Sequence, residues 1–84
     1  MKVEIYSKDF CPYCDRAKAL LEQLGRTYVE KRVDLNPNDF DELRSRAPQA
    51  RTMPQIFIND HHVGGCDDLY ALHDQGKLDQ LFED

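Results

Sequence analysis

The pair Cys11 and Cys14 lies between a strand pattern and a helix pattern, and this placement constrains the fold more than any other feature. Residues 2–6 alternate between apolar and polar side chains, which predicts a short strand. Residues 12–24 begin with a proline, carry apolar side chains at helical spacing and are followed by a glycine, which predicts a helix. The two cysteines are therefore expected at the N-terminus of a helix that follows a strand.

The rest of the chain predicts a small α/β fold. Further elements are expected in this order: a strand at 28–35, a helix at 40–47 after a turn at 36–39, strands at 55–58 and 61–63, and helical segments at 67–76 and 77–82. The first two strands are joined by a helix, so they should be parallel, whereas the turn Asn59-Asp60 predicts an antiparallel hairpin. The order β-α-β-α-β-β-α thus predicts a four-stranded mixed sheet.

Composition limits the class of protein. The 84 residues fit one domain, residues 1–84, and 40% hydrophobic with 32% charged residues is typical of a globular chain. A net charge of −5 argues against nucleic-acid binding. No apolar run approaches the roughly 20 residues that span a membrane, and no secretory signal is visible at the N-terminus. We therefore expect a cytoplasmic protein, in a compartment that keeps thiols reduced.

Two cysteines at this spacing leave three chemistries open: half of a zinc site, a structural disulfide or a redox centre. Zinc would need four ligands, and Cys11, Cys14 and Cys66 with one histidine would supply them. No second closely spaced pair completes such a site, so no metal is expected. Three cysteines in all do not resemble a disulfide framework. The position between strand and helix favours the redox centre.

A helix N-terminus also divides the roles of the two thiols. Its unpaired N–H groups and partial positive charge stabilise a thiolate, which can lower a cysteine pKa from about 8.5 to roughly 3.5–7.5. Cys11 stands at that end, and Lys8 can add positive charge. Cys14 lies one turn further in and should be more shielded. We expect an exposed attacking thiol at Cys11 and a resolving thiol at Cys14.

Three segments, CPYC after IYSKDF, then RTMPQIFI, then GGCDDL, resemble the glutaredoxin family in its dithiol class, and the resemblance covers nearly the whole chain. It implies a thioredoxin-like fold, with helices on both faces of a four-stranded mixed sheet. It also implies reduction of protein–glutathione mixed disulfides through Cys11 alone, and of protein disulfides through Cys11 with Cys14. Glutathione would be the co-substrate, with no tightly bound cofactor.

The resemblance also implies a glutathione site. Thr52, Met53 and Pro54 match a segment with a cis proline, where the backbone of Met53 would pair with the cysteinyl part of glutathione. Methionine replaces the usual valine there, which should change only local packing. Lys8 would pair with the glycine-end carboxylate, and Tyr13 would flank the ligand.

The segment GGCDD resembles the second part of that site. Gly65 would allow close backbone approach, and the helix start at Cys66 and Asp67 would offer N–H groups to the γ-glutamyl carboxylate. The Asp67 side chain can meet the γ-glutamyl ammonium, although an aspartate there can equally cap the helix. The Cys66 thiol is expected to matter less than its backbone.

Partners and alternatives follow from the same resemblance. Expected partners are glutathione and glutathionylated or disulfide-containing proteins, of which ribonucleotide reductase is one suggested client, and the protein should act as a monomer. An iron–sulfur cluster-binding glutaredoxin is the main alternative, against which Pro12 argues. A thioredoxin-like protein served by a flavoprotein reductase is another, but such a protein has no need of the GGCDD segment. The three histidines, Arg16 and Arg51 are assigned to the solvated surface.

Overall fold

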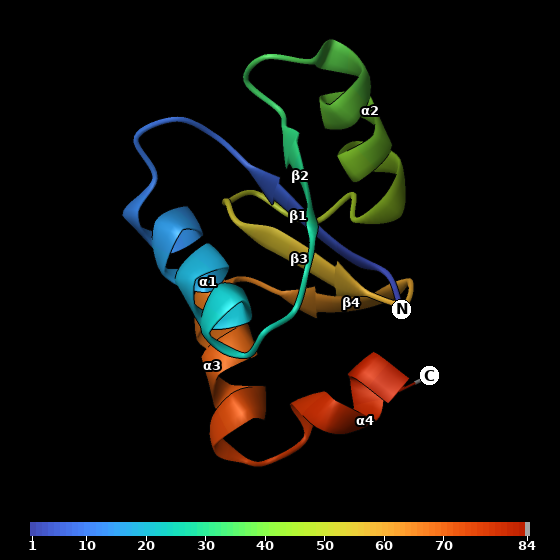
Figure 1. The fold of residues 1–84 in the computed structure, drawn as a ribbon. Coiled ribbons are helices and arrows are strands. Elements are labelled where there is room, and N and C mark those ends of the chain that lie inside the picture. Colours follow the sequence, from blue (N-terminus) through green and yellow to red (C-terminus); the bar gives the residue numbers. More distant parts are fainter. Residues whose placement is uncertain (84) are drawn as a thin grey trace.

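The computed structural model describes residues 1–83 and has a four-stranded mixed sheet with strand order β2-β1-β3-β4 (Figure 1). The elements, in chain order, are β1 (Val3–Ser7), α1 (Pro12–Gln23), β2 (Val29–Arg32), α2 (Pro37–Arg46), β3 (Gln55–Ile58), β4 (His61–Gly64), α3 (Cys66–Asp74) and α4 (Leu78–Glu83). β1 is parallel to β2 and antiparallel to β3, and β3 is antiparallel to β4. The predicted thioredoxin-like α/β fold is confirmed.

The helices cover both faces of the sheet, and Figure 1 shows α2 on the side away from α1 and α3. Side chains alternate along β1, so Val3 and Ile5 face one layer and Tyr6 faces the other. The main core joins the first face of the sheet to α1, α3 and α4 through Val3, Ile5, Ala17, Leu20, Leu21, Ile56, Ile58, Cys66, Leu69, Leu78 and Phe82. This larger core holds α1 and α3 against the sheet, and the N-termini of both helices lie at the candidate site.

The second face of the sheet is a smaller core with a buried charge. Tyr6 and Phe57 pack there against Leu43 and Ala47, next to α2. Glu4 also lies on this face and is only 2% exposed. Its carboxylate accepts hydrogen bonds from two cations, Lys31 Nζ at 2.9 Å and Arg46 Nη1 at 2.9 Å. Ion pairs with neighbouring cations are what make this burial tolerable.

Two predicted boundaries were wrong by three residues, whereas the others lie within two residues of the observed ones. β2 ends at Arg32 rather than at residue 35, because residues 33–35 form a turn in which the Leu35 N–H donates to the Arg32 carbonyl. α2 begins at Pro37 rather than at residue 40, because the fixed φ of proline suits the first helical position after Asn36. The predicted hairpin is confirmed, and Asn59 and Asp60 both have the positive φ of its tight turn.

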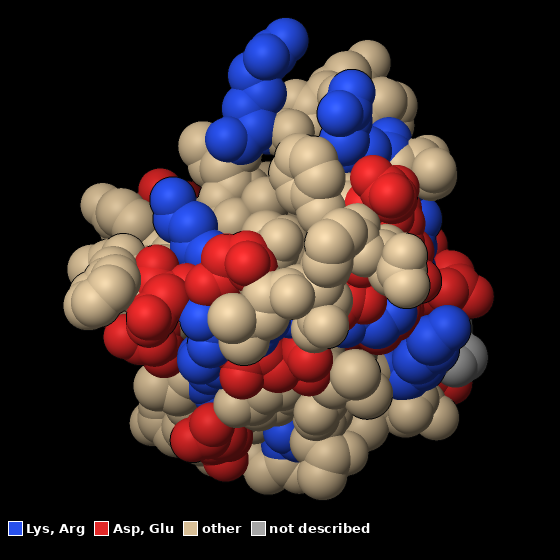
Figure 2. All heavy atoms as spheres, turned by 90° about the horizontal axis from the view of Figure 1, so that it is seen from above, with Lys and Arg blue, Asp and Glu red and all other residues tan. Residues whose placement is uncertain are grey.

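No helix within residues 1–83 is long and apolar enough to cross a membrane. Figure 2 shows acidic and basic side chains interspersed over the face that it presents.

Candidate functional site

Cys11 and Cys14 are joined by a disulfide at the N-terminus of α1. Cys11 is the N-cap residue with an extended backbone, and Pro12 follows in the first turn, as predicted. The Cys14 N–H donates a hydrogen bond to the Sγ of Cys11 over 3.2 Å. A sulfur atom therefore takes the place that a hydroxyl or carboxylate oxygen occupies in an ordinary N-cap.

The prediction that Cys11 is an exposed thiol was wrong for this disulfide form. As predicted, however, Cys14 is the more shielded of the two cysteines. Cys11 is 6% exposed and Cys14 is 1% exposed. The disulfide turns the Cys11 sulfur toward the helix, and its Sγ also lies 3.7 Å from the carbonyl oxygen of Met53. Cys11 remains the more exposed of the two residues.

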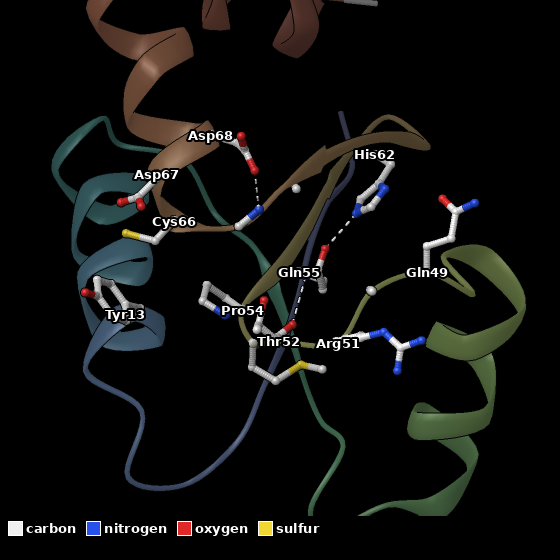
Figure 3. A pocket seen from close by; sticks show the side chains of 14 residues that line it. Tyr13, Gln49, Arg51, Thr52, Pro54, Gln55, His62, Cys66, Asp67 and Asp68 are labelled. Atoms are coloured by element: carbon white, nitrogen blue, oxygen red, sulfur yellow. Dashed lines mark hydrogen bonds between the residues drawn. The ribbon is translucent and has the colours of Figure 1, made fainter.

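The loop before β3 approaches the disulfide through a cis peptide bond between Met53 and Pro54, which confirms the predicted cis proline. Side-chain hydrogen bonds stabilise this loop. Gln55 is buried, and its Nε2 donates to the Thr52 carbonyl over 2.8 Å. Gln55 Oε1 lies 2.7 Å from His62 Nε2 on β4 (Figure 3). Because the amide nitrogen is engaged by Thr52, its oxygen accepts and His62 Nε2 carries the proton.

At the start of α3, the backbone of Gly64 lies close to the side chain of Asp68. The Asp68 Oδ2 accepts a hydrogen bond from the Gly65 N–H over 3.0 Å, so Asp68 caps the helix. Gly64 has φ of 114°, and a Cβ there would lie 2.3 Å from the same Oδ2, so only glycine fits. The neighbouring Asp67 is exposed and makes no such capping contact.

A groove of about 580 Å³ connects the cis-proline loop with the start of α3 (Figure 3). It brings together most of the predicted ligand residues, namely Tyr13, Thr52, Met53, Pro54, Gly65, Cys66 and Asp67. Lys8 is exposed and is not one of the residues that line the groove, so its predicted role stays a prediction. The groove also has lining residues that the sequence analysis missed: Gln49, Ala50, Arg51, Gln55, His62, Gly64 and Asp68.

The two ends of the groove carry opposite charge. Asp67 lies at one end with Tyr13, and Arg51 lies with Gln49 at the other, across the loop of Thr52 and Pro54 (Figure 3). Arg51 was assigned to the solvated surface, but it directly precedes the TMP segment. That adjacency is the signal by which the sequence could have placed it in the site.

Cys66 is a free, buried cysteine of the main core that also lines the groove. Burial raises the pKa of the Cys66 thiol, and the charge of Arg16 offsets only part of this effect. The Arg16 guanidinium lies 5.8 Å from the ring of Tyr13 and 5.3 Å from the ring of Tyr70. Arg16 thus joins the groove wall to α3 through two aromatic contacts.

Within residues 1–83, no three His, Cys, Asp or Glu side chains form a group that could hold a metal ion.

A disulfide at a helix N-terminus, beside a cis-proline loop and on a thioredoxin-like sheet, defines a thiol–disulfide oxidoreductase. A model of the family described as Glutaredoxin matches residues 3–63. The chain belongs to the glutaredoxin family.

Similar proteins agree with this assignment. Glutaredoxin 3 of Escherichia coli (strain K12) is 51% identical over 81 residues, which cover 96% of each chain. A probable glutaredoxin of Synechocystis is 48% identical over 80 residues, which cover 95% of this chain and 91% of that protein. The CPYC segment fits the dithiol type of motif.

Solved structures show the same likeness. The solution structure of glutaredoxin from Brucella melitensis has a TM-score of 0.82 and 50% identity, covering 98% of this chain and 88% of that one. A crystal structure of a buckwheat glutaredoxin–glutathione complex has a TM-score of 0.84 and 34% identity, covering 96% and 76%. Both support thiol–disulfide oxidoreductase activity for this chain.

Proposed function

We propose that this protein is a glutathione-dependent oxidoreductase that reduces protein–glutathione mixed disulfides and protein disulfides. The observation that carries the proposal is the groove with Asp67 at one end and Arg51 at the other. Cys11 and Cys14 do not line it, but Met53 does, and the Met53 carbonyl oxygen lies 3.7 Å from the Cys11 Sγ. Glutathione has an ammonium and a carboxylate at its γ-glutamyl end and a second carboxylate at its glycine end. The similar buckwheat glutaredoxin was solved as a complex with glutathione, which supports the same ligand here.

The γ-glutamyl end of glutathione fits the start of α3. The backbone N–H groups at Cys66 and Asp67 belong to the first turn of that helix, so they are free of intrahelical partners and suit a carboxylate. The exposed Asp67 side chain suits the ammonium. Gly65 leaves the groove open there, because even an added Cβ would approach no closer than 3.5 Å to the Pro54 carbonyl.

The remaining parts of glutathione fit the cis-proline loop. The backbone of Met53 would pair with the cysteinyl part as a strand pairs at a sheet edge, next to the Cys11 sulfur. The glycine carboxylate would then point toward Arg51, which lines the groove, with Lys8 as a second cation. Tyr13 would cover the ligand from α1, and Thr52 would cover it from the loop.

Reduction of a glutathionylated protein needs Cys11 alone. Its thiolate attacks the glutathione sulfur, forms the Cys11–glutathione disulfide and releases the protein thiolate, which takes a proton. The thiolate of a second glutathione then attacks the glutathione sulfur bonded to Cys11. Glutathione disulfide leaves, and the Cys11 thiolate is restored. Overall, the protein–glutathione mixed disulfide and one glutathione thiol become a protein thiol and glutathione disulfide, so the incoming glutathione sulfur is oxidised and the protein sulfur is reduced.

A protein disulfide needs both cysteines. Cys11 attacks one sulfur and releases the other as a thiolate; Cys14 then attacks the Cys11 sulfur, which frees the second substrate thiolate and forms the Cys11–Cys14 disulfide. That disulfide is the form of the site in this structure. Two molecules of glutathione reduce this disulfide. The first attacks the Cys11 sulfur, forms a mixed disulfide with it and releases the Cys14 thiolate. The second attacks the glutathione sulfur of that mixed disulfide, so that glutathione disulfide leaves and the Cys11 thiolate is restored.

The test is a reduction assay with a small glutathione mixed disulfide, coupled to glutathione reductase and NADPH, run beside an assay with thioredoxin reductase as the electron source. The proposal predicts turnover in the first assay and little in the second. Turnover only with thioredoxin reductase would contradict it. A visible absorbance band in freshly purified protein would instead favour the iron–sulfur alternative.

A further inference from the structure

Phe10, the residue directly before Cys11, presents its ring to solvent. It is 94% exposed, the largest exposed fraction among the big apolar residues described for this chain. An isolated apolar residue on a surface is common, but a fully exposed phenylalanine next to a reacting sulfur is placed where a substrate must come. The ring therefore contributes almost nothing to the packing of the chain itself.

The backbone of Phe10 is also unsuited to phenylalanine. Its φ of 51° lies in the left-handed region, which glycine and asparagine tolerate far better than a bulky aromatic residue. Hydrogen bonds to neighbouring side chains stabilise this conformation. The Phe10 N–H donates to Asp9 Oδ1 over 3.1 Å, and the Asp9 N–H donates to Asp34 Oδ2 over 3.2 Å. Arg32 pairs with Asp34, so the strand end supports the loop.

These contacts use only the backbone of Phe10 and the side chains of its neighbours. A glycine or asparagine would make the same backbone hydrogen bond with less strain. Neither the packing nor the turn therefore explains why the position holds a large apolar side chain. Strain retained beside a reacting group is a pointer to a role in function.

Phe10 lies outside the groove, whose lining residues do not include it. With glutathione in the groove, the polypeptide of a glutathionylated protein must leave the reacting sulfur on another side. Consecutive Cα atoms are 3.8 Å apart, so Phe10 stands within one residue of the sulfur-bearing Cys11. The exposed ring therefore belongs to the residue directly bonded to Cys11.

We propose that Phe10 is a specificity residue, which contacts an apolar side chain next to the reacting cysteine of a polypeptide substrate. The proposal rests on the proposed function, because it needs a substrate polypeptide at Cys11. Burying part of the ring against an apolar neighbour would favour such substrates over those with polar residues at the same place. A small glutathione mixed disulfide has no polypeptide and would not use this contact.

The experiment uses the full-length protein and two synthetic glutathionylated hexapeptides that differ only beside the cysteine, with leucine in one and serine in the other. For each, kcat/KM is divided by the value for a small glutathione mixed disulfide. The variants are Phe10→Asn, which suits the left-handed backbone, and Phe10→Leu, which keeps an apolar side chain. Phe40→Asn, which removes another exposed phenylalanine on α2, is the matched control.

We expect the wild type and Phe40→Asn to prefer the leucine peptide by about fivefold, Phe10→Leu to keep most of this preference, and Phe10→Asn to lose it. The melting temperature of Phe10→Asn should not fall. An equal preference in wild type and Phe10→Asn would overturn the proposal. So would a dimer of the wild type that Phe10→Asn dissociates, since the ring would then contact a second copy. Absence of turnover with every substrate would instead refute the proposed function.

Discussion

The backbone N–H of Cys14 donates to the Sγ of Cys11 over 3.2 Å. This N–H belongs to the first turn of α1, where no carbonyl of the same helix can accept from it. When the disulfide is reduced, the same donor and the positive end of the helix favour a thiolate at Cys11. The helix start therefore supports the proposal that Cys11, rather than Cys14, is the attacking sulfur.

The first prediction concerns thiol reactivity. In the reduced protein, brief treatment with iodoacetamide near neutral pH should label Cys11 and spare Cys66, because burial raises the pKa of Cys66 and shields it. Peptide mass spectrometry after alkylation measures the label at each cysteine. Labelling of Cys66 at the same rate as Cys11 would show that the helix start does not select the nucleophile.

The second prediction concerns the acidic end of the groove. Asp67→Ala should raise the KM for glutathione by about tenfold, because it removes the partner proposed for the γ-glutamyl ammonium, and should change kcat little. Steady-state kinetics with varied glutathione measures both constants. Asp74→Ala, which removes an exposed acid at the other end of α3, is the control. A fall in kcat with KM unchanged would place Asp67 outside glutathione binding.

The third prediction separates the two cations proposed for the glycine carboxylate. Arg51 lines the groove and Lys8 does not, so Arg51→Ala should raise the KM for glutathione by several-fold and Lys8→Ala by less. Arg44→Ala removes an arginine from the last turn of α2 and serves as the control for net charge. If Lys8→Ala had the larger effect, the carboxylate would lie on the α1 side of the groove.

The fourth prediction concerns stability in acid. Burial alone would raise the pKa of Glu4, but hydrogen bonds and charges from Arg46 and Lys31 outweigh it, so the folded pKa lies below the ordinary 4.5. The stabilisation is therefore complete above pH 4.5 and is lost as the pH falls through the folded pKa. The pKa values of Glu30 and Glu42 are lowered as well and act in the same direction.

Urea unfolding from pH 7 to pH 3 tests this. Glu4→Gln should cost about 3 kcal/mol at pH 7, because it leaves Lys31 and Arg46 without their buried partner. The difference from the wild type should shrink in acid, where Glu4 becomes protonated. Glu83→Gln, at an exposed carboxylate, should follow the wild type throughout. A constant difference at every pH would mean that the Glu4 charge is not what stabilises the fold.

The sequence allowed prediction of those features that depend on local pattern. The helix start at Cys11 and Pro12 and the hairpin at Asn59 and Asp60 follow from residue preferences at single positions, and the structure has both. The cis bond before Pro54 was expected from the family resemblance. The end of β2 could not be predicted from apolar spacing, because a turn stabilised by backbone hydrogen bonds interrupts the strand after Arg32.

Features that depend on contacts between distant segments were missed. Glu4 fits an alternating strand as a solvent-facing residue, and its burial becomes possible only because Arg46 approaches from α2. Likewise, His62 faces the groove because Gln55, seven positions earlier on the paired strand, accepts its ring N–H. No local pattern contains these pairings, so the far end of the groove became visible only in the structure.

The most direct test of the central claim is the activity of Cys14→Ser beside that of Cys11→Ser, each with a small glutathione mixed disulfide and with a protein disulfide. If Cys11 is the attacking sulfur and Cys14 only resolves, Cys14→Ser keeps turnover of the mixed disulfide and loses reduction of the protein disulfide. Cys11→Ser loses both. A Cys14→Ser variant inactive on both substrates, or a Cys11→Ser variant active on either, would contradict the account.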